Sequence, residues 1–128
     1  MEQQTVTLSV PAEAAYARSV RMMASNLAVV AQMSVDNVED VRMAAEEAFV
    51  FACATRPPQC DISFALANGS MVMDFSLGDS EAVEQDDELL ESLDLAELLR
   101  SAVCDEYEVS EDGTNLHVVK RTAGQDAR

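Results

Sequence analysis

A carboxylate and an aromatic ring one helical turn apart are the first residues in this chain whose spacing could place them in one pocket. Glu47 and Phe51 lie four residues apart within the segment 38–51, and side chains at this spacing are neighbours on an α-helix. Apolar residues recur through this segment, and one residue beyond it, at alternating spacings of three and four: Val38, Val41, Ala45, Ala48 and Ala52. This spacing predicts an amphipathic helix that presents Glu47 and Phe51 beside its buried stripe.

A second group of candidate residues is an acidic run. Nine carboxylates and no basic residue lie between positions 79 and 97: Asp79, Glu81, Glu84, Asp86, Asp87, Glu88, Glu91, Asp94 and Glu97. Their spacing matches no calcium-binding loop, so a metal site is the least favoured interpretation. Two others stay open: a solvated linker that leads into a helix, or a docking surface for a basic partner. The docking candidates are Glu84, Asp86, Asp87, Glu88 and Glu91.

The remaining reactive residue types favour structural roles. Cys53, Cys60 and Cys104 are odd in number and lack metal-ligand spacing, so we expect reduced thiols that fill apolar space. His117 is the single histidine, and a surface or sheet-packing role is favoured over catalysis.

The charge excludes several classes of partner. The 128 residues carry a formal net charge of −16, which argues against direct contact with nucleic acid or an anionic membrane. The first residues show no signal-peptide pattern, and no apolar run is long enough to span a bilayer. A cytoplasmic protein is therefore expected.

The elements that must position these residues follow from the hydrophobic periodicity. Alternation predicts strands over 5–10, 61–67 and 70–77, with Asn68-Gly69 as a two-residue hairpin turn. Pro11 suits the first position of a helix over 11–33, whose stripe would be Tyr16, Val20, Met23, Leu27 and Val30. Ser34 is the expected N-cap of a second helix that ends near Thr55, before Pro57-Pro58. A third helix is expected over 87–104, then strands over 106–110 and 115–121 around a turn at 111–114.

This order, β-α-α-β-β-α-β-β, predicts an α+β two-layer sandwich with helices on one face of a mostly antiparallel sheet. We expect one domain over residues 1–122, which includes the acidic segment 79–90, and a disordered tail over 123–128.

At this point the chain resembles a known family. The element order, the opening Leu8-Ser9-Val10-Pro11-Ala12 and the segment 38–48 are similar to the anti-sigma factor serine/threonine kinases. The resemblance covers about residues 5–121 and includes Asp105-Glu106-Tyr107-Glu108-Val109, Asp112-Gly113-Thr114 and the closing Val118-Val119-Lys120-Arg121. It implies the histidine kinase-like ATPase fold, which gyrase and Hsp90-type chaperones share.

The resemblance implies roles that this chain fulfils only in part. The family's second helix carries Glu-Ala-x-x-Asn, in which the Glu is the general base and the Asn binds Mg²⁺. Glu47-Ala48 matches the first half, but Phe51 stands at the Asn position and offers no oxygen to a hard cation. We therefore expect Glu47 to be a vestigial base, either exposed or salt-bridged to Arg42 or Lys120, and Phe51 to be a plug in the former nucleotide cavity or part of the core.

The two glycine motifs of the family are also altered. In the strand motif Asp-x-Gly-x-Gly, Leu77 takes the place of the adenine-binding Asp, and Asp79 and Glu81 take the places of the glycines. In the Gly-x-Gly that cradles phosphates, Asp94 and Ala96 stand instead. A carboxylate there repels a triphosphate. The departures together predict that no nucleotide, Mg²⁺ or other cofactor is bound.

Three functions stay open. The first is an anti-sigma-like binding module without kinase activity, homodimeric through the sheet face of strands 61–67 and 70–77, whose partner is a sigma factor or an anti-anti-sigma-like protein. The second is an active serine/threonine kinase in which Glu47, with Asp79 or Asp86, holds Mg·ATP. The third is an acidic scaffold, or a mimic of nucleic acid, that binds a basic partner.

Overall fold

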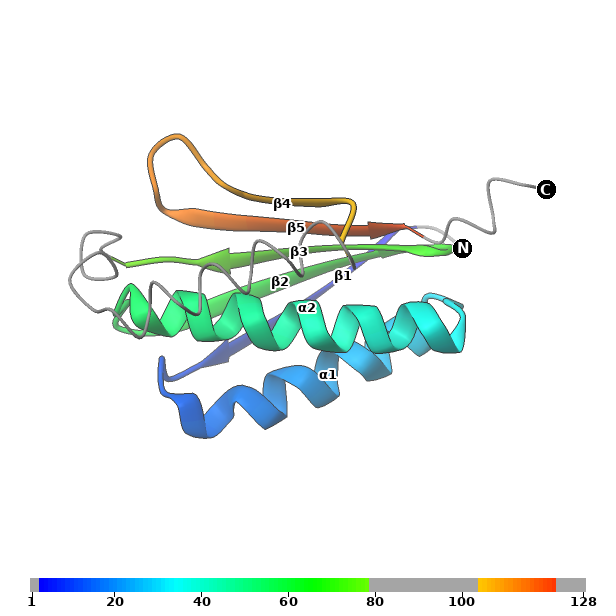
Figure 1. The fold of residues 1–128 in the computed structure, drawn as a ribbon, viewed down its shortest axis with the longest axis horizontal. Helices are drawn as coiled ribbons and strands as arrows, with labels where there is room; N and C mark the ends of the chain where they lie inside the picture. Colours follow the sequence, from blue (N-terminus) through cyan, green and yellow to red (C-terminus); the bar gives the residue numbers. More distant parts are fainter. Residues whose placement is uncertain (1–2, 79–103, 122–128) are drawn as a thin grey trace.

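A five-stranded antiparallel sheet covered on one face by two helices makes up the described part of the molecule (Figure 1). The computed structural model describes residues 3–78 and 104–121. The elements are strands β1 (Gln4–Val10), β2 (Cys60–Ala67), β3 (Ser70–Ser76), β4 (Glu106–Val109) and β5 (Asn115–Arg121), the 3-10 turn η1 (Ala14–Tyr16), and helices α1 (Ala17–Val30) and α2 (Val35–Ala54). The α+β class with an antiparallel sheet is thus as predicted.

The strands lie in the order β1-β2-β3-β5-β4 and every neighbouring pair is antiparallel. Because successive side chains on a strand point to opposite faces, the register defines two faces. Ile62 lies opposite Phe75, and Phe75 opposite Leu116, on the face that the helices cover. Ser63, Asp74 and His117 form the corresponding row on the open face.

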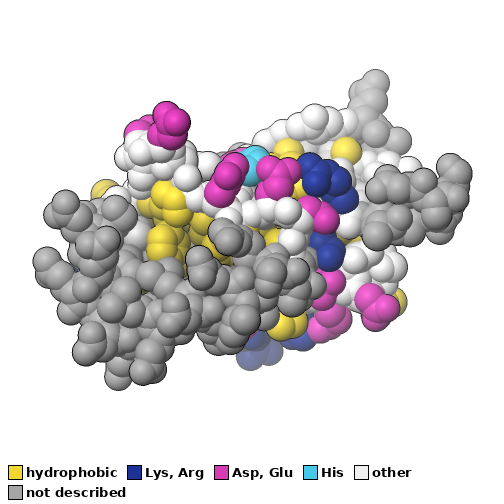
Figure 2. All heavy atoms as spheres, turned by 45° about the horizontal axis from the view of Figure 1, so that its top comes forward, with side chains coloured by type: hydrophobic (Ala, Val, Ile, Leu, Met, Phe, Trp, Pro, Cys, Tyr) yellow, Lys and Arg dark blue, Asp and Glu magenta, His cyan; other side chains and the backbone are white. Residues whose placement is uncertain are grey.

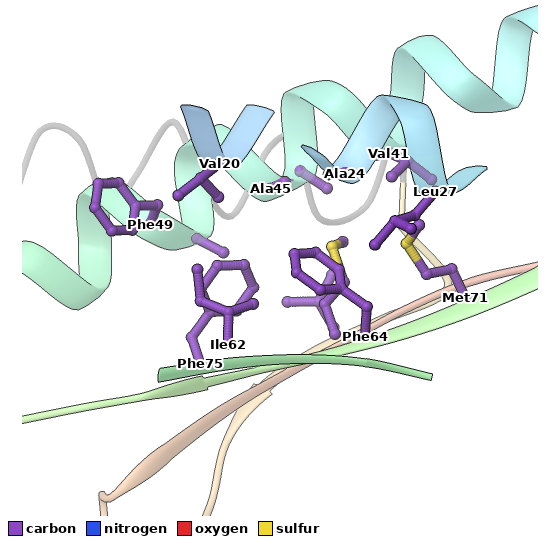
Figure 3. Packing of buried hydrophobic residues seen from close by; sticks show 14 of the residues in the cluster. Val20, Ala24, Leu27, Val41, Ala45, Phe49, Ile62, Phe64, Met71 and Phe75 are labelled. Carbon is purple, nitrogen blue, oxygen red and sulfur yellow. The ribbon is translucent and has the colours of Figure 1, made fainter. Parts of the chain in front are cut away.

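The core fills the space between the sheet and the helices. Figure 3 shows Ile62, Phe64, Met71 and Phe75 rising from the strands towards side chains of both helices. The helix side chains that meet them are Val20, Ala24 and Leu27 of α1 and Val41, Ala45 and Phe49 of α2. Several of the helix positions are alanines, so the helices approach the sheet and each other closely.

Helix α1 begins later than predicted. Pro11 is not helical: its carbonyl accepts a hydrogen bond from the Glu13 backbone N–H at 2.8 Å, and Glu13 itself is extended. The chain therefore turns before η1 begins at Ala14, and α1 follows from Ala17. The predicted stripe is also rotated, because Tyr16 and Val30 are exposed whereas Ala24 and Ala28 are buried.

The turn between α1 and α2 ends the first helix at Val30 rather than near Met33. Gln32 adopts the left-handed conformation, and the Met33 N–H reaches back to the Ala28 carbonyl at 3.1 Å. This hydrogen bond, with that of Gln32 to Val29 at 2.9 Å, is a Schellman motif. Ser34 then caps α2 by accepting a hydrogen bond from the Asn37 N–H, as predicted.

The hairpin turn at Asn68-Gly69 is confirmed, with a difference in detail. Only Gly69 has a positive φ, of 78°. Its N–H donates to the Ala31 carbonyl at 2.8 Å, so the tip of the β2–β3 hairpin is fastened to the turn between the helices.

Helix α2 ends at Ala54, close to the predicted end near Thr55. Thr55 caps the helix and joins it to the residues that follow β3. The Thr55 hydroxyl donates to the Ala52 carbonyl at 2.6 Å and accepts a hydrogen bond from the Gly78 N–H at 2.8 Å. A Cβ atom on Gly78 would lie 2.3 Å from the Thr55 carbonyl oxygen. Only glycine fits this junction, which we call the Thr55–Gly78 junction.

Several expectations fall on residues outside the described part. They are the helix over 87–104 apart from Cys104, the acidic segment 79–90 and the tail 123–128, so the complete element order stays a prediction. None of the helices within residues 3–78 and 104–121 is long and apolar enough to cross a membrane.

Candidate functional site

The face of α2 that carries Glu47 is turned towards β5. Asp40, Ala44, Glu47 and Phe51 follow one another at helical spacing, and Asp40 at one end of this row forms an ion pair with Lys120 of β5 at 3.1 Å. Glu47 and Phe51 therefore share one face of the helix, as the sequence predicted.

Glu47 is half-buried and has none of the predicted partners. Arg42 pairs with Glu39 and Lys120 with Asp40, so the expected salt bridge from Glu47 to either cation is wrong. The reason is geometric: Glu39 lies one turn from Arg42 on α2, and Asp40 lies 3.1 Å from Lys120. Burial, followed by repulsion from Glu46, raises the pKa of the Glu47 carboxyl above its ordinary value of 4.5.

Phe51 packs against the hydrophobic core and is partly buried. Leu77, which follows β3, is 8% exposed and belongs to the same core. Its backbone N–H donates to the Thr114 carbonyl at 2.9 Å. The positions that the family resemblance assigns to a metal ligand and to an adenine contact thus hold apolar groups that stabilise the fold.

The other predicted site residues lie outside the described part. These are Asp79, Glu81, Asp94 and Ala96 of the altered glycine motifs, and the docking candidates Glu84, Asp86, Asp87, Glu88 and Glu91. Within residues 3–78 and 104–121, no group of three or more histidine, cysteine, aspartate or glutamate side chains could hold a metal ion.

The ion pair between Lys120 and Asp40 was missed by sequence reasoning, although a signal was present. Lys120 is the single lysine of the chain and follows Leu116 and Val118 on the inward-facing positions of β5. A cation at an inward position of a strand needs a partner. The Lys120 side chain is 13% exposed and Asp40 meets it from the helix, which closes this corner of the molecule.

A polar cluster on the open face of the sheet was also missed. Asp74 Oδ1 lies 2.8 Å from His117 Nδ1 and accepts a hydrogen bond from Asn115 Nδ2 at 2.8 Å. Glu108 of β4 lies across from His117. Figure 2 shows carboxylates, the single histidine and basic side chains gathered side by side over this end of the sheet. Sequence reasoning placed His117 in the sheet, but only the register reveals Asp74 as its neighbour.

The helices enclose a shallow groove of about 430 Å³ between α1 and α2. It is lined by Met22, Ser25, Asn26, Val29, Val38, Glu39 and Arg42. Met22 and Val29 are more than half exposed, whereas Met33, Met71 and Met73 are core residues. The methionines are therefore divided between core and surface.

The cysteines are unreactive by their surroundings. Burial raises the thiol pKa of Cys53 to about 11, of Cys60 to about 12 and of Cys104 to about 11. The protonated thiol is not nucleophilic, so at neutral pH these groups act as small apolar side chains, as expected.

Comparison with protein-family models found no match to this chain, and a search of curated proteins found no match either.

Proposed function

We propose that this domain is a regulatory protein-binding module of the anti-sigma kinase type that has lost nucleotide binding and phosphotransfer. The observation that carries the proposal is Phe51, which packs into the core one helical turn beyond Glu47. An apolar ring in this position cannot supply an oxygen to Mg²⁺. Its contacts with the core favour the position that it occupies.

Two further observations support the loss of the nucleotide site. Leu77 is a core residue in the place of an adenine-binding carboxylate, and Lys120, a cation near the same helix face, is held by Asp40 rather than free for a phosphate. Each change removes an attraction for ATP, and the formal charge of −16 adds a repulsion.

Binding by surface complementarity needs no ATP, so the module can regulate a partner by occupying it. The partner we propose is a sigma factor or an anti-anti-sigma-like protein, bound by a homodimer of the domain. The basic part of such a partner would meet the strongly acidic surface of this chain, because opposite charges steer encounter and fix orientation.

The proposal is tested by titration of the full chain with Mg·ATP in a calorimeter. We expect no heat of binding up to millimolar nucleotide. We also expect that a co-purified or co-expressed sigma factor or anti-anti-sigma-like protein binds the chain in the absence of ATP. Clear micromolar binding of Mg·ATP would overturn the loss of the site. The matched control is Phe51→Asn, which restores the amide of the family motif without changing net charge.

One observation favours the kinase alternative. The pKa of Glu47 is raised by burial, and a raised pKa is common for carboxylates that act as general bases. Phosphotransfer to a candidate partner that disappears in Glu47→Gln would establish this alternative, whereas transfer that persists in the variant would remove Glu47 from the reaction.

A further inference from the structure

The two edges of the sheet differ in how well they are protected against pairing with another strand. Edge strand β4 has four residues, of which Glu106 and Glu108 are charged. Edge strand β1 has seven residues and carries no charge and no proline. Short length, charge and proline are the devices that keep sheet edges from pairing, and β1 has none of them.

The free side of β1 has backbone groups available for hydrogen bonding. In an antiparallel ladder about half of the N–H and C=O groups of an edge strand point away from its neighbour. No backbone hydrogen bond joins β1 to any segment other than β2 within the residues that the structure describes. Val6 and Leu8 point to the core face but are only half-buried, because the sheet ends beside them.

We propose that β1 pairs in antiparallel fashion with β1 of a second copy of this chain, about a two-fold axis at Thr7. This pairing joins the two sheets into one continuous sheet of both copies. It places Val6 opposite Leu8 of the other copy on the core face, and Thr5 opposite Ser9 on the open face. Core-facing residues of one copy thus lie opposite core-facing residues of the other copy, as a correct register requires.

Charge favours this occupant and this edge. A two-fold contact brings a surface patch against the same patch of the other copy, so in a chain of net charge −16 most patches would oppose like charges. Strand β1 is neutral and escapes this repulsion. A pairing of β4 with itself centred on Tyr107 would place Glu106 opposite Glu108 of the other copy, which is unfavourable.

The inference deepens the homodimer of the proposed function and moves its contact from the sheet face to the sheet edge. The open face, with Asp74 and His117, then stays accessible on both copies as a surface for the regulated partner. The dimer does not depend on the absence of ATP. Titration with Mg·ATP therefore tests the proposed function, whereas sedimentation and cross-linking test the dimer contact.

The test combines sedimentation with cross-linking of the full chain. We expect wild-type protein to sediment as a dimer. Thr7→Cys should form a covalent dimer on mild oxidation, because directly opposed side chains have Cβ atoms about 5 Å apart. The matched control is Ser63→Cys, which lies next to Thr7 on the same face but on β2. In the edge-paired dimer its two copies are about 14 Å apart, three strand spacings, and should cross-link at least about tenfold less.

Wild-type protein under the same oxidation corrects for Cys53, Cys60 and Cys104, whose thiols stay protonated at neutral pH. A monomer at every concentration, or a dimer that neither variant cross-links, would overturn the proposal. Equal cross-linking of both variants would replace it with packing through the sheet face. If Thr7→Cys does not fold, an equimolar mixture of Thr5→Cys and Ser9→Cys tests the same register.

Discussion

The two faces of the sheet differ in composition and burial, although the same alternating strands form both. On the helix-covered face, Ile62, Phe75 and Leu116 are fully buried, and the Lys120 cation is paired with Asp40. On the open face, Ser63, Asp74 and His117 stand in one row and remain partly exposed. The difference teaches that stability is concentrated on the covered face, which leaves the open face free to change its chemistry at small cost to the fold.

The largest expected effect is a core truncation on the covered face. Phe75→Ala should lower the free energy of unfolding by about 3–5 kcal/mol, because it removes a fully buried ring and leaves a cavity. Val72→Ala, on the open face of the same strand, should cost less than about 1 kcal/mol. Urea unfolding followed by circular dichroism measures both. Equal losses would contradict the contrast between the faces.

The next effect concerns the ion pairs that Lys120 and Arg121 of β5 form. Lys120→Ala should cost about 1–3 kcal/mol because it leaves the partly buried Asp40 without its partner. Arg121→Ala, which breaks the exposed pair with Glu106, should cost less than about 0.5 kcal/mol.

The combined replacement Asp40→Leu with Lys120→Met sharpens this prediction. It removes both charges, so its stability should return to within about 1 kcal/mol of the wild type or exceed it. A double variant as unstable as Lys120→Ala alone would show that packing of the lysine stem, and not the unpaired carboxylate, causes the loss.

A smaller effect is expected from the polar cluster on the open face. Asp74→Asn keeps the side-chain size and should cost at most about 1 kcal/mol, because both members of its pair with His117 are about one third exposed and solvent screens the interaction. A loss as large as that of Phe75→Ala would mean that this cluster is structural in the same way as the core.

The smallest effect is a change of pH dependence at Glu47. Its pKa is raised in the folded protein, so the folded state binds the proton more tightly than the unfolded state, and stability falls as pH rises through the interval above 4.5. Glu47→Gln should therefore be more stable than the wild type at pH 7, by at most about 0.5 kcal/mol because the side chain is half exposed to solvent. The gain should vanish near pH 4. A gain that persists at low pH would have a cause other than ionisation.

Much of the described fold was predictable from local pattern. The strands over 5–10 and 61–67 show alternation, and the Asn68-Gly69 turn indicates the return strand over 70–77. The Ser34 cap and the Pro57-Pro58 stop define α2 to within a residue or two. The start of α1 was not predictable, because a proline fits both the first turn of a helix and the bend that precedes one. The predicted buried face of α1 was partly wrong, because it left out Ala24 and Ala28, which are buried. Alanine is only weakly hydrophobic, so a hydrophobicity pattern does not reveal that the small side chain lets a helix pack closely.

The site was predictable only in part. The shared face of Glu47 and Phe51 follows from helical spacing, and Lys120 was detectable as a charge in an apolar row. Its partner Asp40 and the pairing of Asp74 with His117 depend on contacts between elements far apart in the sequence, 80 and 43 residues respectively. Local patterns contain no information about such contacts before the packing and register are known.

The Thr55–Gly78 junction has a consequence for how this protein can diverge. The chain leaves β3 at a point that the end of α2 holds in place, and a side chain at residue 78 would collide with that helix end. The end of β3 and the end of α2 therefore hold each other in place through this one contact. A substitution at residue 78 would therefore disturb a strand end and a helix end together, although glycine itself contributes no side chain to the core.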